Sequence, residues 1–211
     1  MKDGIILVDK PSGITSFDVI RSLRRKLGVR KMGHAGTLDP LATGLLIVGV
    51  GTATKDLTAL VGLPKVYEAE ILLGTRTDTS DIDGRVVEIV PVPTLSTNEI
   101  ESTLTGMKGT LDLPVSLYSA IKKDGKPLYK YARDGKDIEA PMRTMIVRDV
   151  RFVSYDDYVI RAVFDVSSGT YIRSLAEELA RRLKTVGTIQ NLRRVSIGDY
   201  KVQNAKKLED F

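Results

Sequence analysis

Short apolar runs separated by polar turns alternate along the chain with stretches in which apolar residues recur every three or four positions. Runs of the first kind are typical of strands, and stretches of the second kind are typical of helices. The first pattern predicts strands at 5–8, 45–50, 66–73, 86–90, 117–121, 147–155, 159–166 and 191–197. The second pattern predicts helices at 16–27, 52–61, 96–107, 128–133 and 171–183.

Capping residues define the ends of two of these predicted helices. Ser16 is the expected N-cap of the first helix, Gly28 ends it, and the apolar spacing places Phe17 on its buried face. Ser96 followed three residues later by Glu99 is the sequence pattern of a capping box. A helix is therefore expected to begin at each of these two serines.

The order of the elements indicates the fold class. Strands and helices interleave without regular βαβ spacing, and the segments 147–155 and 159–166 predict an antiparallel hairpin across Asp156 and Asp157. The chain contains no internal repeat and no linker-like segment. We therefore expect one α+β domain over residues 1–211, with a mixed, largely antiparallel sheet flanked by helices.

The composition excludes several kinds of chemistry. Of 211 residues, 42% are hydrophobic and 28% are charged, as in ordinary soluble globular proteins, and no apolar run is long enough for a membrane span. The absence of cysteine excludes disulfides and thiolate nucleophiles, and a single histidine argues against a zinc site. We expect a cytoplasmic protein that uses neither a metal nor a cofactor.

The positive charge is concentrated rather than evenly spread. The formal net charge is +5, from 32 Lys and Arg against 27 Asp and Glu. A single basic run is usually a solvated helix face, but three of them beside candidate functional loops predict a polyanionic partner. These basic groups are 21–31, with Arg21, Arg24, Arg25, Lys26, Arg30 and Lys31; 122–133, with Lys122, Lys123, Lys126, Lys130 and Arg133; and 181–194, with Arg181, Arg182, Lys184, Arg193 and Arg194.

The segment 33–44, Gly-His-Ala-Gly-Thr-Leu-Asp-Pro-Leu-Ala-Thr-Gly, is the most informative part of the chain. Pro40 disfavours helical angles for Asp39, so the aspartate is expected to project from a stiff loop just before a buried strand. Taken alone, an Asp-Pro pair is most often a turn with a solvated carboxylate. With a carboxylate nucleophile that needs no metal still open, Asp39 is the first candidate catalytic residue.

Other candidates have plainer explanations when each is taken alone. Tyr67 on a predicted strand is usually a packing residue, and Arg173 in the first turn of a helix is usually a surface ion pair. The common phosphate-binding and dinucleotide-binding glycine motifs are absent, as is the Gly-x-Ser-x-Gly nucleophile motif. The combination of segments is therefore more informative than any one of them.

That combination closely resembles the TruB family of pseudouridine synthases. The resemblance includes the segment 33–44 and extends, in the same order along the chain, over 10–16, 65–67, 74–84, 118–135, 168–183 and 192–194. It implies the pseudouridine synthase fold with a central active-site cleft, and isomerisation of the T-loop uridine of tRNA, uridine-55 in standard tRNA numbering. The segment 76–84 is more similar to the stand-alone bacterial enzymes than to guide-RNA-dependent relatives.

The resemblance also implies roles for individual residues. Asp39 matches the nucleophile, which attacks either uracil C6 or ribose C1′. Arg173 matches the arginine that pairs with this aspartate, and Asp81 belongs to the same polar network. Tyr67 matches the tyrosine that stacks on the flipped-out base and takes the C5 proton.

Three further positions complete the site that the resemblance implies. Tyr171 and Leu192 match residues that line the uracil pocket, and His34 matches one that holds the flipped-out loop. The implied partner is the T-arm of tRNA, bound by a monomer. Longer relatives continue into a C-terminal PUA-type RNA-binding domain, which we do not expect within residues 1–211.

Alternatives of other classes remain open on the sequence alone. The protein would be an RNA-binding chaperone if the carboxylate had no chemical role, or a synthase of the same chemistry acting on another RNA or within a guide-RNA complex. A glycosidase usually needs a pair of catalytic carboxylates, and Asp39 has no evident carboxylate partner in the sequence.

Overall fold

The computed structural model describes residues 3–119, 121–134 and 138–211. The α-helices are α1 (Ser16–Leu27), α2 (Leu57–Val61), α3 (Thr97–Thr105), α4 (Leu128–Arg133) and α5 (Ile172–Arg182), and short 3₁₀ turns lie at Gly51–Lys55, Val202–Asn204 and Leu208–Asp210. The strands are β1 (Gly4–Lys10), β2 (Met32–Ala35), β3 (Thr43–Val50), β4 (Lys65–Leu73), β5 (Thr75–Thr77), β6 (Val86–Ile89), β7 (Gly109–Pro114), β8 (Lys122–Lys123), β9 (Lys126–Pro127), β10 (Met142–Asp156), β11 (Val159–Val166), β12 (Gly187–Ile197), β13 (Tyr200–Lys201) and β14 (Lys206–Lys207).

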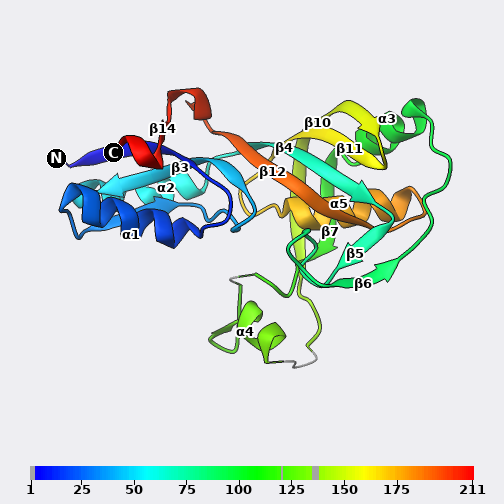
Figure 1. The fold of residues 1–211 in the computed structure, drawn as a ribbon, viewed down its shortest axis with the longest axis horizontal. Coiled ribbons are helices and arrows are strands. Elements are labelled where there is room, and N and C mark those ends of the chain that lie inside the picture. The colour runs from blue at the N-terminus through cyan, green and yellow to red at the C-terminus, as the bar shows by residue number, and fades with distance from the viewer. Residues whose placement is uncertain (1–2, 120, 135–137) are drawn as a thin grey trace. The chain divides into compact units, whose positions relative to one another are not determined.

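The large sheet has the strand order β14-β1-β3-β12-β4-β11-β10-β7, with β2 paired to β3 and β13 paired to β12 (Figure 1). The pairs β1–β14 and β12–β3 are parallel, whereas β1–β3, β2–β3, β10–β7 and β12–β13 are antiparallel. The predicted mixed sheet with flanking helices is therefore confirmed. The chain forms two compact units, unit 1 with residues 1–69, 163–169 and 191–211, and unit 2 with residues 70–162 and 170–190.

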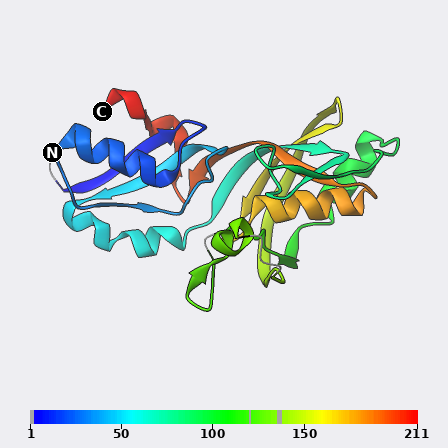
Figure 2. The ribbon, with the colours of Figure 1, turned by 60° about the horizontal axis from the view of Figure 1, so that its bottom comes forward.

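Unit 1 has three layers (Figure 2). Side chains alternate between the two faces of β3, so Leu46, Val48 and Val50 pack against the α1 side chains Val19, Ile20 and Leu23. The other face of β3, with Leu45 and Ile47, packs with Ile197 of β12 and with the α2 residues Leu57 and Leu60. This continuous burial on both faces explains the uninterrupted apolar run of β3.

The start of α1 differs from the sequence-based expectation. Thr15 rather than Ser16 is the N-cap, because its side chain accepts from the Asp18 N–H and the Asp18 carboxylate accepts from the Thr15 N–H in return. Phe17 is 54% exposed, so its predicted place in the core is wrong. Its ring lies beside the guanidinium groups of Arg21 and Arg24, at 5.6 and 5.8 Å from the ring centroid.

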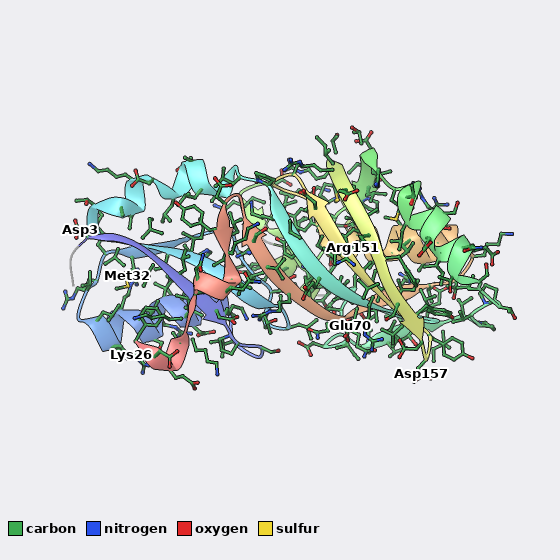
Figure 3. The ribbon with its side chains drawn as sticks, turned by 90° about the horizontal axis from the view of Figure 1, so that it is seen from above. Asp3, Lys26, Met32, Glu70, Arg151 and Asp157 are labelled. Carbon is green, nitrogen blue, oxygen red and sulfur yellow. The ribbon has the colours of Figure 1, made fainter. Side chains whose placement is uncertain are left out.

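Unit 2 contains α3 and α5, which contact each other and pack on β10 and β7 respectively. The capping box at Ser96 and Glu99 is present at the start of α3, as predicted. The predicted hairpin is also present, and its turn at Asp157 and Tyr158 has positive φ at both residues. Asp157 marks the tip of this turn in Figure 3.

The segment between β7 and β10 carries the α4 helix and the short β8–β9 pair (Figure 1). The predicted helix 128–133 is confirmed with the same ends. The predicted strand 117–121 is wrong for residues 117–119, which form a bend, and residue 120 lies outside the described residues. Residue 135, at the end of the matching segment 118–135, also lies outside them.

Within the described ranges, no helix has the length and apolar character needed to cross a membrane.

Candidate functional site

Asp39 lies in the loop that joins β2 to β3. These two strands pair antiparallel from Met32–Val50 to Ala35–Ile47, so the loop 36–42 closes a hairpin at one end of the buried β3 strand. The Asp39 side chain is half-buried, whereas its neighbours Leu38 and Ala42 are buried. The expectation of an aspartate that projects from a loop before a buried strand is confirmed.

Hydrogen bonds hold the backbone of this loop at every carbonyl from Gly36 to Leu41. The Leu38 carbonyl accepts from Ser16 Oγ, and the Leu41 carbonyl accepts from Ser12 Oγ. The Pro40 carbonyl accepts from both the Gly13 N–H and Lys10 Nζ. The Asp39 carbonyl accepts from the Ala42 N–H at 3.1 Å. The carbonyls of Gly36 and Thr37 accept from Arg194 at 3.0 and 3.4 Å. A loop whose acceptors are all satisfied by the protein has a well-defined backbone, and this backbone carries Asp39.

Ser16 explains why the helix cap shifts to Thr15. The Ser16 hydroxyl donates to the Leu38 carbonyl at 3.1 Å and accepts from the Leu38 N–H at 2.9 Å. Ser16 is 1% exposed, so both bonds are inside the protein. The first residue of α1 therefore fixes the residue that precedes Asp39.

Arg194 is a buried structural cation, not a surface contact for a polyanion. It is 1% exposed, and its Nε donates to the Leu45 carbonyl at 2.8 Å while its two terminal nitrogens hold the Asp39 loop. Its neighbour Arg193 forms a two-bond ion pair with Asp9, at 3.0 and 2.7 Å. Of the basic group 181–194, Arg194 is therefore unavailable to a polyanionic partner, whereas Arg193 is partly exposed and paired with Asp9.

Two buried lysines add to the positive charge around this loop. Burial lowers the pKa of Lys10 to about 8, repulsion from Arg194 adds to this, and the negative charge of Asp39 acts in the opposite direction. Burial and repulsion from Arg194 likewise lower the pKa of Lys65 to about 8, and Lys65 Nζ donates to the carbonyls of Val61 and Leu63. Of these two lysines, Lys10 is close enough to Asp39 for their opposite charges to attract.

His34 lies on β2, opposite Val48 of β3, three residues before Thr37. Burial lowers its pKa, and Arg194 adds to this effect, so the imidazole is neutral at neutral pH. Its Nδ1 is buried and has no hydrogen-bond partner among the described residues. His34 is thus close in the chain to the Asp39 loop, and its ring is kept uncharged.

Tyr67 and Leu192 are buried residues of unit 1, at 7% and 6% exposure. Tyr67 follows Lys65 on the buried face of β4, which continues with Ala69, Ile71 and Leu73. Leu192 lies on the same face of β12 as Arg194. Its carbonyl accepts from Thr43 Oγ1 at 3.5 Å.

Arg173 is the buried cation of unit 2. It lies in the first turn of α5 and is 5% exposed, so a surface ion pair is ruled out. It donates to the carbonyls of Thr79 at 2.7 Å and Tyr118 at 3.1 Å, and to Ser116 Oγ at 3.3 Å. The nearer Asp81 carboxylate oxygen lies 4.0 Å from its Nη1 atom.

Asp81 and Tyr171 complete the predicted residues of unit 2. Asp81 is 8% exposed, and its Oδ1 accepts from Thr79 Oγ1 at 2.7 Å. Tyr171 is half-buried and forms the N-cap position of α5, where its N–H lies 3.5 Å from the sulfur of Met145. Asp81 and Arg173 thus approach each other within unit 2.

The second basic group belongs to the segment between β7 and β10. Lys122, Lys123 and Lys130 are exposed, and the half-buried Lys126 pairs with Asp134 at 2.5 Å. A cavity of about 440 Å³ adjoins this group, lined by Ile121, Lys122, Lys123, Glu139, Ala140, Pro141, Met142 and Arg143. Three of these lining residues are basic and one is acidic, so the surface has a net positive charge that favours a polyanion.

The structure thus groups the predicted residues by unit. Asp39, His34, Tyr67 and Leu192 belong to unit 1, and Arg173, Asp81 and Tyr171 belong to unit 2. The sequence-based prediction missed the supporting side chains in both units: Ser16, Lys10, Lys65 and Arg194 in the first, Ser80 and Glu177 in the second. Only Arg194 had a local signal, because Leu192, Arg194 and Ser196 alternate on one face of a strand.

Comparisons with known proteins agree on one family. The model of the TruB family pseudouridylate synthase (N terminal domain) matches residues 24–172. The chain is 42% identical over 207 residues to tRNA pseudouridine synthase B of Azoarcus sp. (strain BH72), covering 98% of this chain and 69% of that protein. It is 44% identical to tRNA pseudouridine synthase B of Caldicellulosiruptor saccharolyticus, over 98% of this chain and 71% of that protein.

Solved structures show the same fold. A chain in a crystal structure of a Cbf5-Nop10-Gar1 complex superposes with a TM-score of 0.77 at 26% identity, covering 98% of this chain and 53% of that chain. A crystal structure of a pseudouridylate synthase gives a TM-score of 0.51 at 15% identity, over 98% and 68% of the two chains, and supports the fold alone. This chain spans about half the length of the first of these structures.

Proposed function

This chain belongs to the TruB family of pseudouridylate synthases, and on that premise we propose that it isomerises the T-loop uridine of tRNA, uridine-55, to pseudouridine. The observation that carries the proposal is the Asp39 loop. Its carbonyl oxygens from Gly36 to Leu41 all accept hydrogen bonds, so the backbone that carries a single carboxylate is fixed, and the charge of Lys10 lies close to that carboxylate. A fixed, charged nucleophile reduces the reorganisation that the reaction requires.

In the proposed reaction Asp39 attacks the uridine at uracil C6 or at ribose C1′. The bond between N1 and C1′ breaks, the uracil turns, a bond forms between C5 and C1′, and the bond to the Asp39 carboxylate breaks, which regenerates the free carboxylate. The C5 proton leaves and N1 gains a proton, so the product is an isomer of the substrate. Neither route changes the oxidation state of the base, and the proposal therefore includes no redox cofactor.

The remaining residues of unit 1 recognise the base in this proposal. Tyr67 stacks on the uracil and takes the C5 proton, Leu192 lines the pocket, and His34 supports the flipped-out loop. The low exposure of Tyr67 and Leu192 supports an apolar site, and the neutral imidazole of His34 supports a role in packing against RNA. Stacking on an aromatic ring contributes about 1–3 kcal/mol per base.

In this proposal, Arg173 and Asp81 of unit 2 keep the reacting carboxylate ionised. Tyr171 lines the uracil pocket. Burial of Arg173 and its ordered hydrogen bonds support a role that needs a fixed cation. An arginine stays charged when buried, whereas a lysine readily loses its proton.

The proposed partner is the T-arm of tRNA, bound by one copy of this chain. The uridine must leave its stack at a cost of a few kcal/mol, which stacking and phosphate contacts offset. The exposed lysines at 122–130 and the adjoining cavity support phosphate binding by unit 2.

Incubation of the protein with T-arm RNA, followed by chemical mapping of pseudouridine, tests the proposal. We expect conversion at the T-loop uridine and none in a matched RNA that carries cytidine there. Ribosomal RNA fragments are the competing substrates, and preferential modification of those would replace tRNA in the proposal. No product from correctly folded protein would refute it.

The Asp39→Asn variant tests the role of the carboxylate. The amide has nearly the same shape but is a far weaker nucleophile, so kcat should fall on the order of 10⁴-fold or more. RNA affinity and thermal unfolding should change little, because the bonds that hold the loop end on its backbone. Turnover by this variant close to that of the wild type would remove Asp39 from the reaction.

A further inference from the structure

Helix α5 holds the loop that carries Asp81 at two points, one helical turn apart. Arg173 and Glu177 are four residues apart, so their side chains lie on the same face of α5. Arg173 donates to the Thr79 carbonyl at 2.7 Å, and Glu177 Oε1 accepts from Ser80 Oγ at 2.8 Å. Two consecutive loop residues are therefore fixed by two side chains of one helix.

Ser80 needs this support because of its backbone conformation. Its φ is +63°, in the left-handed region that side chains other than glycine rarely adopt. Ser80 is 4% exposed, so water does not compete for its hydroxyl. Its carbonyl accepts from the Ile189 N–H at 3.0 Å, and the Ile82 N–H donates to the Ile189 carbonyl at 2.8 Å.

The unusual angle at Ser80 sets the direction of the groups on either side of it. The Thr79 carbonyl before it accepts from Arg173, and the Asp81 carboxylate after it lies 4.0 Å from the same guanidinium group. Thr79 Oγ1 also donates to Asp81 Oδ1 at 2.7 Å. A change of φ at Ser80 would therefore turn both acceptors away from Arg173.

We propose that Glu177 is a positioning residue for Arg173: by accepting the Ser80 hydroxyl, it holds the turn that aims the Thr79 carbonyl and the Asp81 carboxylate at the guanidinium group. The inference rests on the proposed function only in that Arg173 serves the reaction. Burial raises the pKa of Glu177, while Ser80, Arg76 and Arg173 oppose that rise.

The adjacent Glu178 supplies a matched control. It lies on the same helix but binds Arg181 and Arg182, at 2.7 Å from each. Glu177→Ala should lower kcat about 10-fold and change KM less than about 2-fold, because a misdirected Arg173 affects the reaction more than RNA binding. Glu178→Ala should leave kcat within about 2-fold of the wild type. Equal loss of kcat in both variants would overturn the proposal.

Rescue variants separate positioning from a general loss of stability. Glu177→Gln keeps an acceptor for the Ser80 hydroxyl and should lose less than about 3-fold in kcat. In the Glu177→Ala background, Ser80→Gly should recover most of the lost kcat, since glycine adopts positive φ without support, whereas Ser80→Ala should not. Equal activity of these two double variants would overturn the proposal, as would full activity of Glu177→Ala.

A measurement that needs no activity keeps this inference separate from the proposed function. Amide hydrogen exchange at Ile189, whose N–H donates to the Ser80 carbonyl, should be about 10-fold faster in Glu177→Ala and unchanged in Glu178→Ala. If the wild type fails to modify T-arm RNA, the proposed function fails while this result still decides the role of Glu177. Unchanged exchange in Glu177→Ala would overturn it.

Discussion

The Asp39 loop of unit 1 and the Ser80 loop of unit 2 are fixed in different ways. In the first, residues 36–41 are held through their backbone carbonyls, by donors from β1, α1, β12 and the turn after β1. In the second, residues 77–84 are held by backbone bonds and also by their own side chains, among them the Thr77, Thr79 and Ser80 hydroxyls. We therefore expect the loss of one hydrogen-bond donor to change the conformation of the Asp39 loop less than that of the Ser80 loop.

The two loops also differ in the charge that surrounds them. Buried cations, namely Lys10, Lys65 and Arg194, surround the Asp39 loop, whereas the Ser80 loop brings the carboxylates of Asp81 and Glu177 to one arginine. Burial disfavours the charged form in both places, so it lowers the pKa of the lysines and raises that of Glu177. A rise in pH should therefore stabilise the Asp39 loop, where the buried lysines lose their charge, and destabilise the Ser80 loop, where Glu177 becomes charged.

The largest expected loss of stability comes from disturbing the close backbone contact between Gly44 and Arg194, beside the Asp39 loop. Gly44 has φ +101°, and a Cβ there would lie 2.3 Å from the Arg194 carbonyl oxygen. Gly44→Ala should lower the unfolding free energy by more than about 3 kcal/mol, because strain and a backbone clash add together. Urea denaturation measures the loss.

Gly13→Ala is the control for this substitution. Gly13 has φ +84°, but a Cβ there would have no other atom within 4 Å, so only the conformational strain of about 1 kcal/mol is expected. Equal losses in Gly44→Ala and Gly13→Ala would show that the contact with β12 is not what fixes this end of the loop.

The second largest expected effect is a pH dependence of the unfolding free energy, which comes from the buried lysines. The pKa of Lys65 is about 8 in the fold, below the ordinary 10.5, so the unfolded chain binds more protons between these values. The unfolding free energy should therefore rise from pH 8 to pH 10.5, by up to about 3 kcal/mol from this group. In Lys65→Met the rise should be smaller.

Lys55→Met, at an exposed lysine, controls for the loss of one positive charge. Urea titrations of the three proteins at several pH values across this window provide the comparison. Parallel curves for the wild type and Lys65→Met would contradict the assignment of Lys65 as a buried and destabilising charge.

The smallest effect on stability is expected in the Ser80 loop. A Cβ at Gly84 would lie 2.2 Å from Thr79 Oγ1 and 2.8 Å from Asp78 Oδ1, two side-chain atoms that can rotate away, and 3.0 Å from the Thr79 backbone nitrogen, which needs a shift of only a few tenths of an ångström. Gly84→Ala should thus cost only about 1 kcal/mol. It should nevertheless lower kcat several-fold, because Thr79 Oγ1 would leave Asp81.

Thermal unfolding together with kinetics on T-arm RNA would measure both effects of Gly84→Ala. A variant with unchanged kcat would show that the Thr79–Asp81 bond is dispensable, and the contrast between the two loops would then lose its functional meaning.

Local features of the fold were predictable from the sequence. The capping box at Ser96, the end of α1 at Gly28 and the α4 helix involve residues close in the chain, so their patterns contain the information that forms them. The motif around Asp39 likewise predicted a stiff loop before a buried strand, and its resemblance to one family identified the fold and the proposed reaction.

Only the tertiary structure decided which polar and apolar side chains lie inside. Apolar spacing along α1 placed Phe17, Ile20 and Leu23 in the core, but Phe17 is exposed and β3 packs on Val19 together with Ile20 and Leu23. The sequence places Arg194 in a basic group expected to face a polyanion. In the fold it is buried, because it binds the Gly36 carbonyl, 158 residues away in the chain.

Glu177 shows the same limit, because its partner Ser80 is 97 residues away and the left-handed angle of that serine has no sequence signature. A sequence specifies which groups can donate and accept and which surfaces are apolar. Burial and hydrogen-bond partners between distant segments arise only when those segments pack together, because each depends on the position of the other.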